Sequence, residues 1–316
     1  MAQSNIKAVF IGGADRSGTT MLGAALGNAP TAITTPESQF VYEVYKISKR
    51  EQVSVDETWH ALTSHIRFKF WDVSVPPKPD VGDSLNDNAF AAMVIAMVEH
   101  YAGEKCASKS PQFWIDHTPL NTRNVALILH LFPNAKIVHL LRDGRAIAAS
   151  FQNLHWGPQS VYATARWWPA RISHGLAAQL RYGPEVVHQF RYEDVITRPY
   201  ETLPRVCNFV GIEFTEEMAL GFGDFEVPEF SKEQHALVGK AFDASRIDAW
   251  KKSLTPRQIE IFEAETFELL HSFGYESMFP AGPKPIRIRE KLRSAVVEAI
   301  ANTYYFFRTL VSDKFG

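Results

Sequence analysis

The 316-residue chain is 46% apolar and 22% charged, and its formal charge is −2. This is the composition of an ordinary globular protein, and it excludes broad attraction to nucleic acid, so any anion site must be local. The cysteines, Cys106 and Cys207, are too few for a disulfide framework and are typical of a reducing compartment. No apolar run reaches the ~18–20 residues of a membrane span, and the N-terminus has no apolar signal segment. We therefore expect a cytoplasmic protein.

The chain opens with a strand–loop–helix pattern that is typical of anion-binding loops. Gly13 and Gly18 have the spacing of the P-loop motif G-x-x-x-x-G-K-[ST]. Thr20 occupies the Ser/Thr position, but Thr19 stands in the lysine position, and the cation of the loop is Arg16. Backbone N–H groups and the helix dipole favour a phosphate at such a loop. The missing lysine argues against ordinary ATP or GTP hydrolysis, in which that residue reaches the β- and γ-phosphates.

Strand and helix patterns alternate along the rest of the chain. This alternation predicts an α/β fold, a three-layer P-loop-like arrangement in which helices flank a central parallel sheet. Ligands of such folds bind along the carboxyl edge of the sheet. The expected strands are 8–11, 32–34, 105–109, 136–141 and 185–190, and the expected helices are 21–26, 39–50, 55–70, 87–101, 120–132, 146–153, 161–181, 199–210 and 256–273.

The tail 284–316 differs from the rest in charge. Seven basic residues against three acidic ones give it a net charge of +4, and aromatic residues cluster at 304–307. We expect a main domain over 1–283, followed by a basic amphipathic helix. Such a helix could close over the chain's own core, pack in a homodimer, or lie on a membrane surface.

Three expected strand ends each deliver an arginine to the same edge of the sheet. They are the loop 13–20, the segment 142–145 and the segment 191–194. Arg142 at a strand end and Ser150 in the following helix could together grip a second phosphate. Two separate phosphate sites and a loop without lysine point to a nucleotide that is phosphorylated at both ends of its ribose.

The ordered set of motifs resembles the sulfotransferases that use 3′-phosphoadenosine 5′-phosphosulfate (PAPS), and among them the bacterial and tyrosylprotein branch. Any one motif would be weak evidence, but their order along residues 7–276 is specific. The matching segments are 12–20 for the 5′-phosphosulfate loop, 131–150 for the 3′-phosphate motif, 191–195 with 209–211 for the tyrosine–glutamate segment, and 245–250 with 273–275 for the C-terminal part.

The resemblance implies that PAPS is the donor, that PAP is the product, and that no metal is needed because the donor is already activated. It implies that Glu37 is the general base, since an alcohol or phenol is a poor nucleophile until its proton is taken. Arg16 and the loop amides would stabilise the charge on the leaving oxygen. The implied cofactor contacts are Arg16, Ser17, Gly18, Thr19 and Thr20 at the 5′-phosphosulfate, Arg142 and Ser150 at the 3′-phosphate, and Tyr192 and Lys240 elsewhere. Glu37 also fits a helix-start carboxylate, and Tyr192 also fits a core aromatic.

The chain departs from the relatives at one position. They carry a lysine fourteen residues before the Leu-Phe-Pro segment, where this chain has His117. A protonated His117 could stabilise the leaving group, and the rate would then fall as the pH rises past its pKa. Lys109 could instead reach in from another backbone position, and His117 could be a purely structural histidine.

The sequence thus predicts an enzyme that moves the sulfuryl group of PAPS onto an acceptor hydroxyl or amine. The acceptor could be a small molecule, a glycan, a lipid or a peptide, and the segments 72–86 and 221–240 are expected to shape its pocket. A P-loop kinase for a small metabolite fits the same fold, but Thr19 in the lysine position weighs against it. A catalytically inactive PAP-binding scaffold is the third candidate, and His117 is the residue that favours it.

Overall fold

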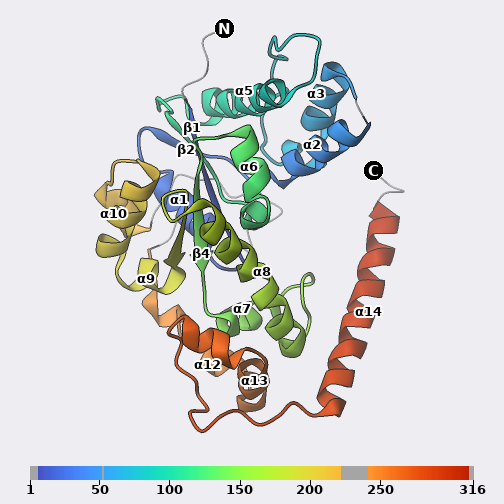
Figure 1. The fold of residues 1–316 in the computed structure, drawn as a ribbon, viewed down its shortest axis with the longest axis vertical. Helices are drawn as coiled ribbons and strands as arrows, with labels where there is room; N and C mark the ends of the chain where they lie inside the picture. The colour runs from blue at the N-terminus through green and yellow to red at the C-terminus, as the bar shows by residue number, and fades with distance from the viewer. Residues whose placement is uncertain (1–5, 52, 222–240, 313–316) are drawn as a thin grey trace. The chain divides into compact units, whose positions relative to one another are not determined.

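The chain packs into two compact units, one formed by residues 1–141 and 174–242 and the other by residues 142–173 and 243–316. The structure, a computed structural model, describes residues 6–51, 53–221 and 241–312, with side chains up to residue 304 (Figure 1). The boundary expected at residue 283 is not tested by this division and stays a prediction.

A parallel sheet of five strands forms the centre of the first unit, in the order β2-β3-β1-β4-β5. The middle strand β1 pairs on both sides, with Val9 opposite Ile115 of β3 and opposite Lys136 of β4. The strands are apolar almost throughout because helices cover both faces of the sheet. The predicted parallel sheet is therefore confirmed. The strands are β1 (Lys7–Gly13), β2 (Ala32–Thr34), β3 (Phe113–Asp116), β4 (Lys136–Leu141) and β5 (Val187–Arg191).

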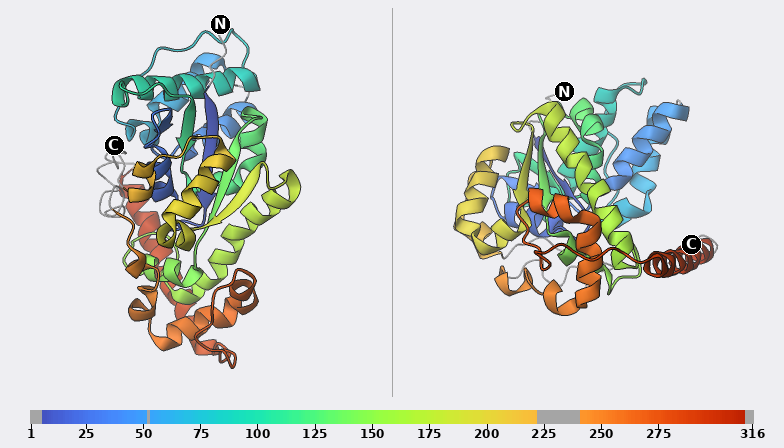
Figure 2. Two further views of the ribbon diagram at one scale, coloured as in Figure 1. Left: turned by 90° about the vertical axis from the view of Figure 1, so that its left-hand side faces the viewer. Right: turned by 60° about the horizontal axis from the view of Figure 1, so that its bottom comes forward.

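Helices of the first unit lie on both faces of the sheet. Figure 2 shows α1 (Thr19–Leu26) on one side of the strands and α6 (Val125–Leu131) on the other. This three-layer arrangement is the predicted fold class. The remaining helices of this unit are α2 (Gln39–Glu51), α3 (Val55–Ser64), α4 (Ile66–Lys69), α5 (Asp87–Lys105), the 3-10 turn η1 (Pro119–Arg123), α9 (Tyr192–Thr197), α10 (Pro199–Val210) and α11 (Glu216–Leu220).

The second unit is helical and has its own core. A Cβ atom at Gly144 would lie 2.4 Å from the Phe262 ring and 2.6 Å from the Trp168 ring, so only glycine fits between these two aromatics. In the described part of the chain, no helix combines the length and the apolar sequence that a membrane crossing needs. The helices of this unit are α7 (Gly144–Phe151), the first part of α8 (Val161–Tyr182), the 3-10 turn η3 (Ala244–Arg246), α12 (Trp250–Ser253), α13 (Pro256–Ser272) and α14 (Ile288–Ser312).

The strand predicted at 105–109 is wrong. Helix α5 continues into this segment because Tyr101, in its last turns, still packs in the core. The third strand begins instead at Phe113. There the N–H groups of Gln112 and Phe113 donate to the Thr31 carbonyl, at 2.7 and 3.0 Å, and so align β3 with β2.

Two helices expected as single elements are divided. The helix expected at 55–70 breaks at His65, whose ring nitrogen accepts the N–H of Arg67 at 3.1 Å and starts α4. The helix expected at 120–132 begins as the 3-10 turn η1 before α6. This turn lets the Asn121 side-chain amide donate to the carbonyl of Ile11 in β1, at 3.0 Å.

Candidate active site

The loop between β1 and α1 is packed too tightly for side chains at its glycines. A Cβ atom at Gly13 would lie 2.4 Å from the Leu140 carbonyl oxygen of β4. Gly18 has φ +95°, and its Cβ would lie 2.6 Å from the Tyr192 ring. Arg16, between them, also has a left-handed backbone, with φ 69°. The two glycines therefore allow a tight turn that leads directly into the N-terminus of α1, where N–H groups favour an anion.

Ser17 is the most enclosed residue of this loop. Its side chain is fully buried, and its N–H donates to the Ala14 carbonyl at 3.1 Å. Among the described residues its hydroxyl has no hydrogen-bond partner. A buried hydroxyl without a partner is costly, and such groups in native structures often mark a place for a ligand or an ion. Thr19 and Thr20 are also buried, at the start of α1.

Glu37 is held at the edge of the sheet by its neighbours in sequence. The Thr35 N–H donates to the Ile115 carbonyl at 3.3 Å. The Ser38 N–H donates to Asp116 Oδ2 at 3.2 Å and to Thr118 Oγ1 at 2.9 Å. The segment between β2 and α2 is thus fixed on both sides of Glu37 by the end of β3.

The surroundings of Glu37 change its acidity. Burial raises its pKa to about 7, the nearby charges of Arg67 and Arg16 act to lower it, and those of Asp116 and Asp15 act to raise it. The structure therefore brings Glu37 into electrostatic reach of two residues of the anion loop, Asp15 and Arg16. A carboxyl group with a pKa near the working pH is suited to proton transfer.

Asp116 is a site residue that the sequence analysis did not single out. Its carboxylate is fully buried and accepts from the Thr118 N–H at 2.9 Å and from Asn121 Nδ2 at 2.6 Å. The Tyr42 hydroxyl donates to Asn121 Oδ1 at 2.5 Å, which joins α2 to the same network. The available signal was an acidic residue directly after the apolar strand residues 113–115. Asp116 positions the Glu37 segment and raises the pKa of Glu37.

The structure separates the two residues considered for the leaving group. His117 is buried, and its Cβ lies 3.0 Å from the Cβ position of Gly23 in α1. Lys109 donates instead to the carbonyls of Gly27 and Ala32, at the end of α1 remote from the loop. His117 is therefore better placed than Lys109. Burial lowers the pKa of His117, although the Asp116 charge acts in the opposite direction, so the neutral imidazole is favoured at pH 7.

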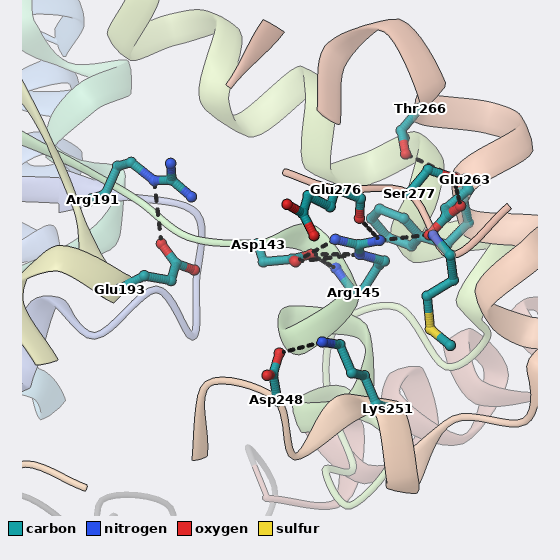
Figure 3. A network of polar contacts seen from close by, with 12 residues as sticks. Asp143, Arg145, Arg191, Glu193, Asp248, Lys251, Glu263, Thr266, Glu276 and Ser277 are labelled. Atoms are coloured by element: carbon teal, nitrogen blue, oxygen red, sulfur yellow. Dashed lines mark hydrogen bonds and ion pairs between the residues drawn. The ribbon is translucent and has the colours of Figure 1, made fainter. Parts of the chain in front are cut away.

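The end of β5 reaches the same loop. Tyr192 begins α9, is buried, and places its ring against Gly18. Its neighbour Arg191 lies 3.7 Å from a carboxylate oxygen of Glu193 (Figure 3). The structure thus brings Tyr192 to the anion loop, while its role as a cofactor contact stays a prediction.

The arginines of the segment 142–145 differ in their surroundings, within the second unit. Figure 3 shows the Arg145 guanidinium between Asp143 and Glu263, with distances of 2.8 and 2.5 Å. Arg145 also donates to the Glu276 carbonyl at 2.8 Å, and its guanidinium lies 4.2 Å from the centre of a Trp250 ring. All of these groups are used within the protein, so Arg145 is a structural residue and not a ligand for phosphate.

Arg142 and Ser150 stand at the two ends of α7, and both are half-buried. They belong to the second unit, whereas the loop, Glu37 and Tyr192 belong to the first. The joint two-phosphate site therefore stays a prediction. Lys240 falls outside the described residues, as does most of the segment 221–240.

A parallel sheet with a glycine loop leading into a helix N-terminus defines the class of P-loop-like folds. Within this class, the profile of the sulfotransferase family matches residues 8–216, which is well over half of the chain. The chain belongs to the sulfotransferase family.

Individual relatives agree with the family. Nodulation protein NoeE of Sinorhizobium fredii is 26% identical over 303 residues, which cover 84% of this chain and 65% of NoeE. Protein-tyrosine sulfotransferase 2 of Gallus gallus is 22% identical over 219 residues, 66% of this chain and 52% of that protein. The chain thus spans between half and two thirds of the length of these relatives.

A solved structure agrees with the fold. The sulfotransferase domain from the Synechococcus PCC 7002 olefin synthase superimposes with a TM-score of 0.59 at 18% identity. The superposition covers 87% of this chain and 98% of that domain. At this level of identity the likeness concerns the fold alone.

Proposed function

We propose that this chain transfers the sulfuryl group of PAPS to an acceptor hydroxyl or amine and releases PAP. The observation that carries the proposal is Glu37, a carboxyl with a pKa of about 7 beside an anion loop that lacks the P-loop lysine. A kinase would need a cation in that position for the β- and γ-phosphates. Sulfuryl transfer needs only a base for the acceptor and donors for one phosphosulfate.

The anion loop is proposed to hold the 5′-phosphosulfate. The N–H groups at the start of α1, together with Arg16, Thr19 and Thr20, would surround its oxygens. Ser17 fits this group best, because its buried hydroxyl has no partner among the described residues and could donate to a phosphate oxygen.

The 3′-phosphate is proposed to bind at the segment that follows β4. Arg142 is joined by one peptide bond to Leu141, the last residue of β4, so its Cα lies about 3.8 Å from that of Leu141. Arg142 and the Ser150 hydroxyl would then bind the second phosphate, with Tyr192 and Lys240 as further contacts. Arg142 presents parallel N–H groups, the geometry that favours a phosphate.

Glu37 is proposed to act on the acceptor. As the acceptor oxygen or nitrogen attacks sulfur, its proton passes to the Glu37 carboxylate. The bond from sulfur to the bridging oxygen breaks, and the electron pair leaves on the 5′-phosphate of PAP. Arg16 and the loop N–H groups would stabilise that charge. His117 could share this task as a cation only if the bound anion raised its lowered pKa again.

A titration tests the donor assignment. The protein should bind PAP more tightly than ATP with magnesium in isothermal calorimetry, because the loop lacks the lysine that ATP requires. Tighter binding of ATP would contradict the proposal and favour a kinase. Turnover of PAPS should then be measured over phenols, sugars, lipid alcohols and tyrosine peptides. Tight PAP binding without turnover on any acceptor would instead identify a binding scaffold.

A further inference from the structure

Helix α14 turns a row of large apolar side chains to solvent. Ile288, Leu292, Val296, Ile300 and Tyr304 are each 58–77% exposed. They are spaced four residues apart, and each step advances about 40° round a helix. The first four therefore cover about 120° of the helix surface, a continuous stripe that we call the α14 stripe. A stripe of this width normally faces the core of a protein.

The opposite side of α14 is the side that binds the second unit, and it does so through polar groups. The Glu298 carboxylate accepts from the Gln159 N–H at 3.0 and 3.2 Å and from the Ser160 hydroxyl at 3.0 Å. The Ser294 hydroxyl lies 2.6 Å from that of Ser160. Helix α14 is thus inverted: its polar side is docked and its apolar side is exposed.

This docking also uses the acidic side chains of the helix. Between Ile288 and Ser312 the sequence contains two acidic residues, Glu290 and Glu298. Glu290 is bound by the Arg257 guanidinium at 2.9 and 2.7 Å, which holds the pKa of Glu290 at about 2. Both carboxylates are therefore committed to the protein itself.

The basic side chains near the stripe remain exposed. Arg287, Arg289, Lys291 and Arg293 all lie in the first turns of α14 or directly before it, and each is exposed. Arg289 and Arg293 follow Ile288 and Leu292 in sequence and so flank the stripe. The outward side of the helix therefore combines apolar groups with positive charge.

We propose that α14 lies in the plane of an anionic lipid bilayer, with the stripe in the boundary between headgroups and acyl chains. Such a surface offers an apolar layer for the stripe and anionic groups for the arginines, whose long side chains can reach back to the headgroups. A second copy of the chain fits this charge pattern less well, because it would bring its own basic residues to the interface while both helix carboxylates are already bound.

Sedimentation with lipid vesicles tests this proposal on the full chain. The protein should sediment with vesicles that contain about one third phosphatidylserine, and bind phosphatidylcholine vesicles at least about tenfold more weakly. Added salt should weaken the binding, because the headgroup attraction is electrostatic. Equal binding to both vesicles, or to neither, would overturn the proposal.

Matched leucine variants locate the contact. Leu292→Asp should lower vesicle binding at least about tenfold, since it puts a charge into the stripe. Leu180→Asp, at a leucine of α8 that is 89% exposed, should leave binding unchanged. Arg289→Gln and Arg293→Gln should each weaken binding about fivefold. An equal loss from both leucine variants would contradict a role of the stripe.

Two further measurements separate the outcomes. If analytical ultracentrifugation shows a dimer that Leu292→Asp disperses, a second copy covers the stripe and the lipid proposal is wrong. Sulfuryl transfer to a dissolved acceptor should be equal in the Leu292→Asp variant and the natural chain. The lipid proposal can therefore fail while the proposed activity stands, and the reverse also holds.

Discussion

Glu37 in the first unit and Arg145 in the second are both ionisable side chains removed from water, but their surroundings differ. Arg145 lies between two carboxylates, a backbone carbonyl and an indole ring. Glu37 is surrounded by charges of both signs and has a pKa of about 7, so it is poised between two protonation states. Close by, the buried Ser17 hydroxyl has no partner among the described residues.

The difference separates a structural site from a candidate reactive one. A buried charge whose partners are all present holds the fold together and has no capacity left for a ligand. A group whose pKa is shifted to the working pH, or a hydroxyl without a partner, retains that capacity. The comparison therefore predicts that variants in the two regions will affect different measurements.

Glu37→Gln should have the largest effect on the reaction. Without the base, turnover should fall about 10²–10⁴-fold, whereas PAP affinity should change little. The measurements are steady-state kinetics and calorimetry with PAP. Glu43→Gln is the matched control in α2, since that side chain is 66% exposed, and it should leave both values unchanged. Equal losses of turnover and PAP affinity in Glu37→Gln would show that Glu37 is structural.

The pKa of Glu37 adds a pH signature to the same variant. Because the carboxylate is the active form, kcat/KM of the natural chain should rise with pH up to about 7 and then level off. Its stability should move the opposite way. The folded pKa is above the unfolded value, so the folded state binds more protons, and stability is lost as the pH rises from 4.5 to about 7.

Removing the carboxyl should remove this loss of stability. At pH 8, Glu37→Gln should be about 1–3 kcal/mol more stable than the natural chain in urea unfolding. At pH 4 the two chains should unfold at nearly the same urea concentration. Parallel unfolding curves for both chains at every pH would contradict the raised pKa.

Arg145→Met should have the largest effect on stability. It leaves the carboxylates of Asp143 and Glu263 buried without their cation, which typically costs about 3–5 kcal/mol. The free energy of unfolding in urea is the measurement. Arg246→Met is the control in the same unit, because its pair with Asp243 is half exposed and should be worth less than about 1 kcal/mol. If both variants were equally stable, Arg145 would not be a structural centre.

Ser17→Ala should have the smallest effect and should change binding without changing folding. PAP affinity should fall about tenfold, since a hydrogen bond to a charged oxygen is lost. The free energy of unfolding should stay the same or rise slightly, because no partner among the described residues is abandoned. Ser48→Ala is the opposite control: Ser48 bonds Thr58 at 3.1 Å, so stability should fall about 1 kcal/mol while PAP affinity holds. The reverse pattern would assign Ser17 to the core.

The sequence by itself determined the features that depend on local pattern. The spacing of Gly13 and Gly18 around Arg16 predicted the anion loop, because a tight turn into a helix needs glycine at those positions. Apolar runs such as 136–141 predicted parallel strands covered on both faces. The ordered motifs also led to the sulfotransferase family, which the profile match over residues 8–216 confirms. These signals lie within a few residues of each other along the chain.

Tertiary structure alone decided what depends on distant neighbours. The segment 142–145 contains two arginines, and only the approach of Glu263 shows that Arg145 is neutralised within the protein. The shifted pKa of Glu37 depends on Asp116 and Arg67, which no spacing rule relates to it. The amphipathic pattern of α14 leaves open which face is covered, and contacts with Gln159 and its neighbours decided that it is the polar one. Charge and burial act through space, so their outcome becomes visible only once the chain has folded.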